Sequence, residues 1–99
     1  NAWWFYYDMN IGGTQTIWAG QHYNAGSVTI SNGEISINLT GGWELQNVNE
    51  PVKIQGYDTI PTDRPAAGQF ETYKGTLLTV TYDGSYNFFA IHLDVQKCQ

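Results

Sequence analysis

Five aromatic residues follow one another at positions 3–7, which read Trp-Trp-Phe-Tyr-Tyr. Indole and phenol rings offer flat apolar surfaces, against which the C–H face of a pyranose sugar packs well. A few convergent polar groups then orient such a ligand by hydrogen bonding its hydroxyls. The chain offers polar groups of this kind at His22, Tyr23, Gln55, Tyr57 and Asp58. These residue types predict binding of a neutral carbohydrate.

The aromatic run has more rings than one core can cover. In a β-strand, successive side chains point to opposite faces, so a core takes at most every second residue. The set Trp3, Phe5 and Tyr7 contains the phenylalanine and is the more apolar, so we expect it to face the core. Trp4 and Tyr6 then point outward.

We expect the outward rings to form a shallow aromatic platform with the turn that follows residue 18 and the loop around Tyr57. The predicted ligand-binding residues are Trp4, Tyr6, Trp18, His22, Tyr23, Gln55, Tyr57 and Asp58. Two roles stay open for Trp18 and for Trp43, which suit either a spare ring or core packing. Tyr86 and Phe88 are either a patch at the tip of a loop or a cover for a sheet edge.

The sequence predicts no catalytic site and no cofactor. The nine acidic residues are scattered, with no pair placed to act together as acid and base. His22 and His92 lie far apart without other ligands at metal spacing, and no serine stands in a G-x-S-x-G context. A structural calcium ion is the alternative left open. The oxygen ligands of this ion would come from Asp58, Thr59, Thr62 and Asp63.

Charge excludes several kinds of partner. The formal net charge is −5 with only four lysines and arginines, so the chain lacks the basic footprint of a nucleic-acid or anionic-membrane binder. No apolar run approaches the roughly 20 residues of a membrane span. We expect a monomer that contacts neither nucleic acid nor membrane.

Alternation and turn signals predict an all-β fold. In residues 27–39, two alternating runs flank Asn32-Gly33, a strong hairpin turn that sets Ile30 opposite Ile35 and Val28 opposite Ile37. A second hairpin is expected over residues 76–95. A four-residue loop, residues 83–86, would set Val80 opposite Phe89 and Leu78 opposite Ile91, which brings the apolar sets together.

Further short strands are expected at residues 14–21, 43–47 and 51–57, with a long loop at residues 58–75. The fold class is therefore a single antiparallel β-sandwich, jelly-roll or immunoglobulin-like, of about seven or eight short strands. One domain spans residues 1–99. The predicted core is Val28, Ile30, Ile35, Ile37, Leu39, Leu45, Leu78, Val80, Phe89, Ile91, Leu93 and Val95.

The order of these signals resembles small β-sandwich modules of secreted bacterial proteins of Bacteroidetes-like sources, similar to carbohydrate-binding modules. The resemblance rests on residues 3–7, 17–30, 35–47, 60–70 and 88–98. It implies a secreted or cell-surface module excised from a larger protein. It also implies a cysteine near each end, whereas this sequence has only Cys98. That residue either pairs outside the fragment or is an incidental thiol.

Two functions follow as expectations. One is a non-catalytic carbohydrate-binding module that recognises a neutral polysaccharide. The alternative is a structural or adhesive module of a multidomain cell-surface protein, because tyrosine and tryptophan also dominate protein interfaces.

Overall fold

The computed structural model describes residues 2–19, 23–63 and 65–97, and it is built of short strands. For Ala2, Trp18, Ala19 and Tyr23 the structure describes the backbone alone. The elements are β1 (Ala2–Asp8), β2 (Thr14–Ala19), β3 (Tyr23–Ser31), β4 (Glu34–Leu39), β5 (Trp43–Leu45), β6 (Val52–Tyr57), η1 (Ala67–Gln69), β7 (Tyr73–Gly75), β8 (Thr79–Thr81) and β9 (Phe88–Lys97).

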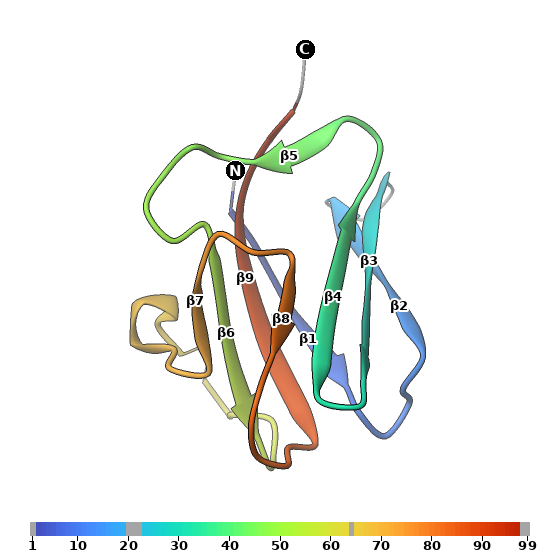
Figure 1. Cartoon of the computed structure of the whole chain (residues 1–99), viewed down its shortest axis with the longest axis vertical. Helices are drawn as coiled ribbons and strands as arrows, with labels where there is room; N and C mark the ends of the chain where they lie inside the picture. The colour runs from blue at the N-terminus through green and yellow to red at the C-terminus, as the bar shows by residue number, and fades with distance from the viewer. Residues whose placement is uncertain (1, 20–22, 64, 98–99) are drawn as a thin grey trace.

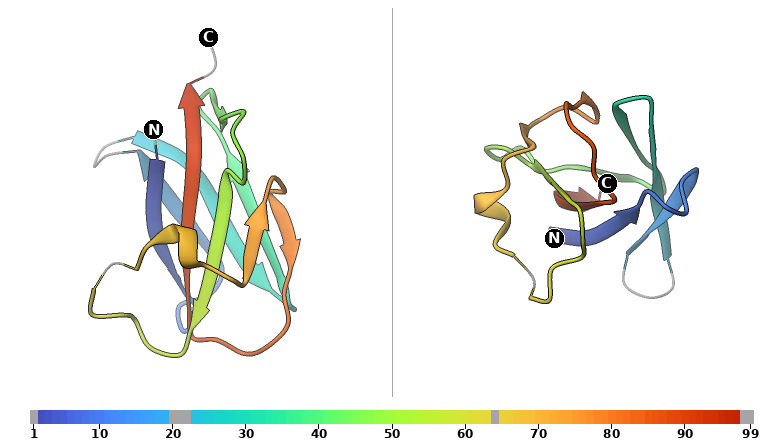
Figure 2. Two further views of the ribbon diagram at one scale, coloured as in Figure 1. Left: turned by 90° about the vertical axis from the view of Figure 1, so that its left-hand side faces the viewer. Right: turned by 90° about the horizontal axis from the view of Figure 1, so that it is seen from below.

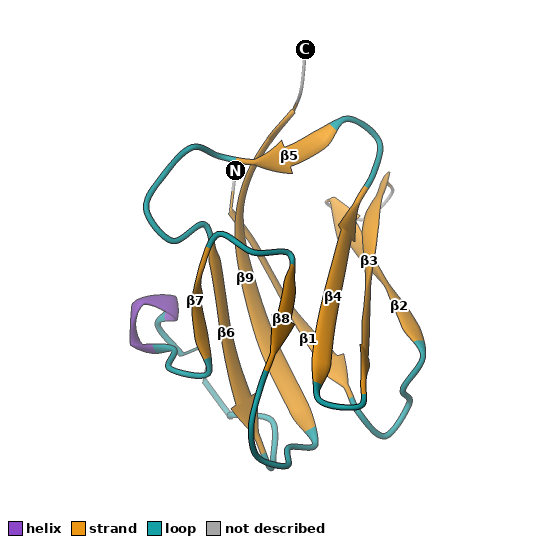
Figure 3. Cartoon of the chain, in the orientation of Figure 1, coloured by secondary structure: helices purple, strands orange, loops and turns teal. Residues whose placement is uncertain are grey.

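Two antiparallel sheets pack face to face (Figure 1). The five-stranded sheet has the order β1-β9-β6-β7, and β5 pairs with the C-terminal end of β9. The four-stranded sheet has the order β2-β3-β4-β8. The predicted all-β sandwich is confirmed, with nine strands in the described ranges. The only helix among them is the single 3₁₀ turn η1 (Figure 3), and no described helix is long and apolar enough to cross a membrane.

The first predicted hairpin is confirmed in turn and in register. Asn32 and Gly33 have φ values of 52° and 76°, the left-handed conformation that a two-residue turn between twisted strands requires. Ile30 pairs with Ile35, and Val28 with Ile37, as the alternation indicates. All four side chains are buried between the sheets.

The second predicted hairpin is wrong. β8 pairs with β4, where Val80 lies opposite Ile35, whereas Phe89 of β9 lies in the other sheet. The segment between β8 and β9 crosses from one sheet to the other. Its Tyr82 and Tyr86 rings pack on Phe89, with ring centroids 4.8 and 5.4 Å away. These ring contacts cover Phe89, near the start of β9.

Most of the predicted core is confirmed. Nine of the twelve predicted residues are buried, and Leu39, Leu45 and Leu78 are partly buried against them. The inward set of β1 is also confirmed, because Tyr7 is fully buried and Trp3 and Phe5 pack against the core. The buried Tyr7 hydroxyl donates to the Gly13 carbonyl at 2.5 Å.

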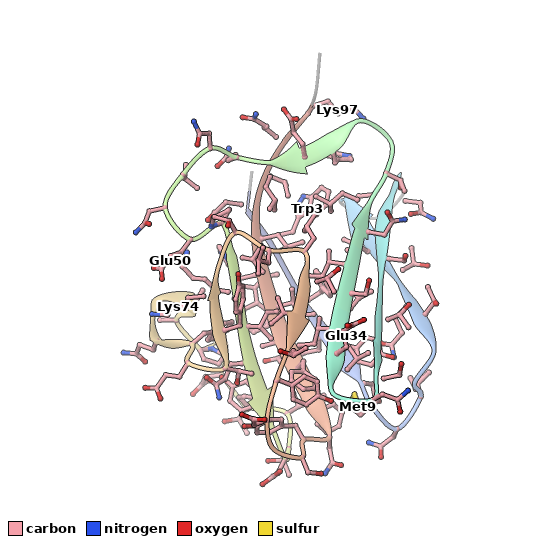
Figure 4. All side chains as sticks on the ribbon, viewed as in Figure 1. Trp3, Met9, Glu34, Glu50, Lys74 and Lys97 are labelled. Atoms are coloured by element: carbon pink, nitrogen blue, oxygen red, sulfur yellow. The ribbon has the colours of Figure 1, made fainter. Side chains whose placement is uncertain are left out.

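Of the two roles left open for Trp43, a spare ring or core packing, the structure shows core packing. The Trp43 ring lies 4.7 Å from that of Trp3, which Figure 4 labels between the two sheets, in an edge-to-face arrangement. The Lys97 ammonium lies 5.0 Å from the centre of the Trp43 ring. Together these residues cover the end of the core beside β5.

Gly56 lets the sheet-crossing segment close over the core. A Cβ at this position would lie 2.5 Å from the Tyr86 ring. We expect Gly56→Ala to lower the free energy of unfolding by about 1–3 kcal/mol, the usual cost of overpacking. Thermal or urea unfolding measures the loss.

Gly68 provides the matched control, because a Cβ there would meet nothing within 4 Å. Gly68→Ala should change stability by less than about 0.5 kcal/mol. Equal losses in the two variants would contradict the position assigned to Tyr86.

Candidate functional site

The candidate site is the outer face of the five-stranded sheet, the side that points away from the core. Because residues alternate, β6 turns Lys53, Gln55 and Tyr57 outward, and β1 turns Trp4 and Tyr6 outward. The two strands flank β9 on opposite sides. In register, Tyr6, Ala90 and Gln55 share one row, and Trp4, His92 and Lys53 share the next.

Three rings gather on this face. Trp4 and Tyr6 have ring centroids 4.9 Å apart and planes inclined at 80°. Phe70 lies 6.0 Å from Trp4 at 66°. Trp4 and Tyr6 are half-buried, although we expected them to be exposed, and Phe70 is only 1% exposed. Trp4 and Tyr6 thus keep part of their surface exposed, whereas the Phe70 ring is buried against Trp4.

The segment from β6 to β7 lies beside these rings. Figure 2 (left) shows it leaving the lower end of β6 and returning with η1 in front of the sheet. Two backbone amides hold it: that of Glu71 donates to Gln55 Oε1 at 2.7 Å, and that of Gly56 donates to Thr72 Oγ1 at 2.9 Å. Lys74, labelled beside η1 in Figure 4, donates from Nζ to the Gly68 carbonyl at 2.5 Å. The segment is therefore fastened to the sheet.

Gln55 has two tasks in this arrangement. Its Oε1 accepts the bond from Glu71, and its Nε2 donates to the Gly56 carbonyl at 3.1 Å. A primary amide has two lone pairs and two N–H groups, so one of each is left over. Gln55 thus fastens the loop to β6. The remaining lone pair on Oε1 and the remaining N–H on Nε2 are the groups that a ligand would use.

Tyr57 adds a further ring, and Phe88 of β9 lies opposite it in register. The pKa of Tyr57 is raised above the ordinary 10.0, first by burial and then by the neighbouring Tyr6 phenol. Tyr6 and Tyr57 lie on opposite sides of β9 in adjacent rows, and Ala90, opposite Tyr6, is fully buried. At neutral pH the Tyr57 hydroxyl is protonated, so it is able to donate as well as accept a hydrogen bond.

Four predicted residues meet on this face: Trp4, Tyr6, Gln55 and Tyr57. Asp58 follows at the end of β6, where it is exposed and its carbonyl accepts a bond from Asn87 Nδ2 at 3.0 Å. The backbone of Trp18 and Tyr23 belongs to the four-stranded sheet. Their side chains and the whole of His22 lie outside what the structure describes, so their part in the site stays a prediction.

The sequence reasoning missed Phe70. Its position in a loop rich in proline and glycine gives it no strand alternation, so nothing in the pattern indicated which face it would cover.

Charged residues border this face: Lys74 lies opposite Lys53 in register, and Asp8 shares the row of Phe88 and Tyr57. Lys53 Nζ lies 3.7 Å from Asp94 Oδ2, so this lysine has a counter-ion. Within the described ranges, no three His, Cys, Asp or Glu side chains gather closely enough to hold a metal ion. The calcium site expected at Asp58, Thr59, Thr62 and Asp63 stays untested.

The opposite outer face, on the four-stranded sheet, has a different composition. Its described residues on β3, β4 and β8 are Ser27, Thr29, Ser31, Glu34, Ser36, Asn38, Thr79 and Thr81. They are short and mostly neutral, and Glu34, labelled in Figure 4, is the one acid among them. The side chains named here for β3, β4 and β8 thus include no aromatic ring, in contrast to the β1-β9-β6 face.

Searches of protein-family models, curated proteins and solved structures find no match to this chain.

The Tyr57 environment has a measurable consequence at alkaline pH. A raised pKa in the folded protein means that ionisation of this phenol is easier in the unfolded chain. Stability should therefore fall as the pH rises through and above about 10, and Tyr57→Phe should make that fall smaller. Urea midpoints at neutral and alkaline pH measure the difference.

The same variant tests the titration directly. Tyrosinate absorbance should show one fewer late-ionising tyrosine in Tyr57→Phe, while Tyr82, whose pKa is raised chiefly by burial, continues to titrate late. Superimposable late titrations of the variant and the unmodified protein would contradict this account.

Proposed function

We propose that this chain is a non-catalytic carbohydrate-binding domain whose outer face, at Trp4, Tyr6, Gln55 and Tyr57, binds a neutral polysaccharide. The observation that supports this most is the meeting of Trp4, Tyr6 and Tyr57 on one sheet face, although they come from two strands separated by β9. The rings supply apolar contact area, while Tyr57 and the remaining capacity of Gln55 bind hydroxyls. The polysaccharide is bound and released without chemical change.

The electrostatics of the face suit a neutral ligand. Lys53 is paired with Asp94, and the Tyr57 phenol is neutral at physiological pH. Lys74, opposite Lys53 in register, donates to the Gly68 carbonyl, so both lysines have a partner within the protein. The predicted secreted or cell-surface location, as part of a larger protein, belongs to this proposal and comes from the resemblance to secreted β-sandwich modules.

The structural or adhesive role is the second candidate, and the burial of Phe70 favours it. The Phe70 ring packs on Trp4, and Gln55 bonds the adjacent Glu71. In this alternative, the rings act as a small second core that holds the loop on the sheet. Loss of the Trp4 ring would then change the loop rather than ligand binding.

Substitution of Trp4 separates the two candidates. We expect Trp4→Ala to weaken retention in affinity gels of soluble neutral polysaccharides by at least about tenfold, the equivalent of 1.4 kcal/mol. Tyr57→Phe, which removes only a hydroxyl, should weaken it about three- to tenfold, the range of one hydrogen bond. The panel comprises hydroxyethylcellulose, galactomannan, arabinoxylan and mixed-linkage glucan.

The control is Ser36→Ala on the outer face of the four-stranded sheet, which should bind normally. All variants are first checked for a cooperative thermal transition. Unchanged retention in both Trp4→Ala and Tyr57→Phe would reject the carbohydrate site. Faster proteolysis of residues 58–72 in Trp4→Ala, with no polysaccharide retained by any form, would favour the structural role.

A further inference from the structure

We propose that a lysine-bearing segment of a partner protein binds one row of side chains on the outer face, formed by Asp8, Phe88 and Tyr57 together with Asp58, which follows Tyr57. We call this set the acidic row. The proposal goes beyond the carbohydrate function and does not depend on it. It gives the alternative adhesive role a partner of defined chemistry.

The side chains of the acidic row come from three neighbouring strands. Phe88 of β9 lies opposite Asp8 of β1 on one side and opposite Tyr57 of β6 on the other. Asp8, Phe88 and Tyr57 are partly exposed, and Asp58 is exposed. The buried Phe70 ring packs on β1 two rows away. The acidic row thus presents aromatic rings and carboxylates together at the surface.

Hydrogen bonds fix the positions of both carboxylates. The Asn87 amide donates to the Tyr57 carbonyl at 3.0 Å, and Asn87 Nδ2 donates to the Asp58 carbonyl at 3.0 Å. At the other side of the row, Asp8 Oδ1 accepts a bond from the Asn10 amide at 2.8 Å, which leaves Oδ2 for a partner. Groups that are already ordered lose little conformational entropy on binding.

The lysines of the described ranges lie away from the acidic row. Lys53 and Lys74 share a row that is four residues further along the strands, or roughly 13 Å away. This separation exceeds the Debye length of about 8 Å at physiological ionic strength, so these lysines neutralise neither carboxylate. Figure 4 shows Lys97 and Met9, the neighbour of Asp8, toward opposite ends of the molecule. The acidic row is therefore complementary in charge to a cationic partner.

The mixture of rings and carboxylates indicates which cation fits. A lysine side chain joins an ammonium group to an apolar stem of four carbons. The stem would pack on Phe88, and the ammonium group would lie between a carboxylate and the Tyr57 ring, where it gains both ionic and cation–π attraction. The amine of an amino sugar is attached directly to a polar ring, so it lacks the stem that matches Phe88.

The test titrates the full chain with tetralysine amide by calorimetry, in about 10 mM and about 150 mM salt. We expect binding in low salt that weakens at least about tenfold in the higher salt, because exposed charges are screened. Acetylation of the lysines removes the charge and should abolish binding. A protonated peptide of diaminopropionic acid keeps the ammonium groups without the long stem and should bind at least about threefold more weakly.

Substitutions locate the binding site. Asp8→Asn and Asp58→Asn keep the backbone bonds, and each should weaken tetralysine binding about three- to tenfold. Phe88→Leu keeps apolar bulk without the ring and should weaken it about threefold. Glu50→Gln is the matched control, because it removes one negative charge next to the start of β6, whereas Tyr57 is at the end of that strand. This control variant should bind normally.

The possible outcomes are distinct. Equal weakening in Asp8→Asn and Glu50→Gln would show attraction to net charge alone and overturn the proposal. Unchanged binding in all three variants of the acidic row, or no binding of tetralysine in low salt, would also overturn it. Tighter binding of chitosan oligosaccharides than of tetralysine would overturn the assignment to a peptide. Affinity gels with neutral polysaccharides test the proposed function separately, because Asp8 and Phe88 are not part of that site.

Discussion

The rest of the structure depends on the pairing of β9 with three other strands. This strand bonds β1 on one side and β6 on the other, and β5 continues the pairing at its far end. Its Phe89, Ile91, Leu93 and Val95 are fully buried in the core. On the outer face, the same register sets Tyr6 and Gln55 on either side of Ala90. Because the side-chain period is two, a shift of one residue would turn the rings of the site toward the core.

Alternation in the sequence predicts the direction of a side chain better than its partner strand. It correctly assigned Trp3, Phe5 and Tyr7 to the inner side of β1, and Val80 and Phe89 to the core. It did not show that β8 and β9 belong to different sheets, because side chains from both sheets enter the same core. The hairpin of β3 and β4 was predictable in full, since Asn32-Gly33 specifies both its turn and its register.

At the candidate site too, alternation predicts the direction of a side chain but not its neighbours. The outward direction of Trp4 and Tyr6 follows from alternation, and their meeting with Gln55 and Tyr57 requires the long-range pairing of β1 and β6 with β9. Phe70 was not predictable as their neighbour, because a loop residue has no periodic pattern. For Gln55, the residue type indicated a polar side chain at the site. It did not indicate that this side chain would bond the Glu71 amide of the loop and the Gly56 carbonyl.

The pairing of β1 with β9 also has a consequence for the order of folding. Ala2 pairs with Asp94, so the first strand finds its partner near the other end of the chain. β2, β3 and β4 form a meander of neighbours that is able to assemble from local contacts, and β6 pairs with the nearby β7, whereas the partner of β1 is the distant β9. Contacts so distant in sequence slow folding. During synthesis, the aromatic strand β1 therefore remains without its partner until β9 has been made, which leaves its rings open to aggregation or chaperone binding.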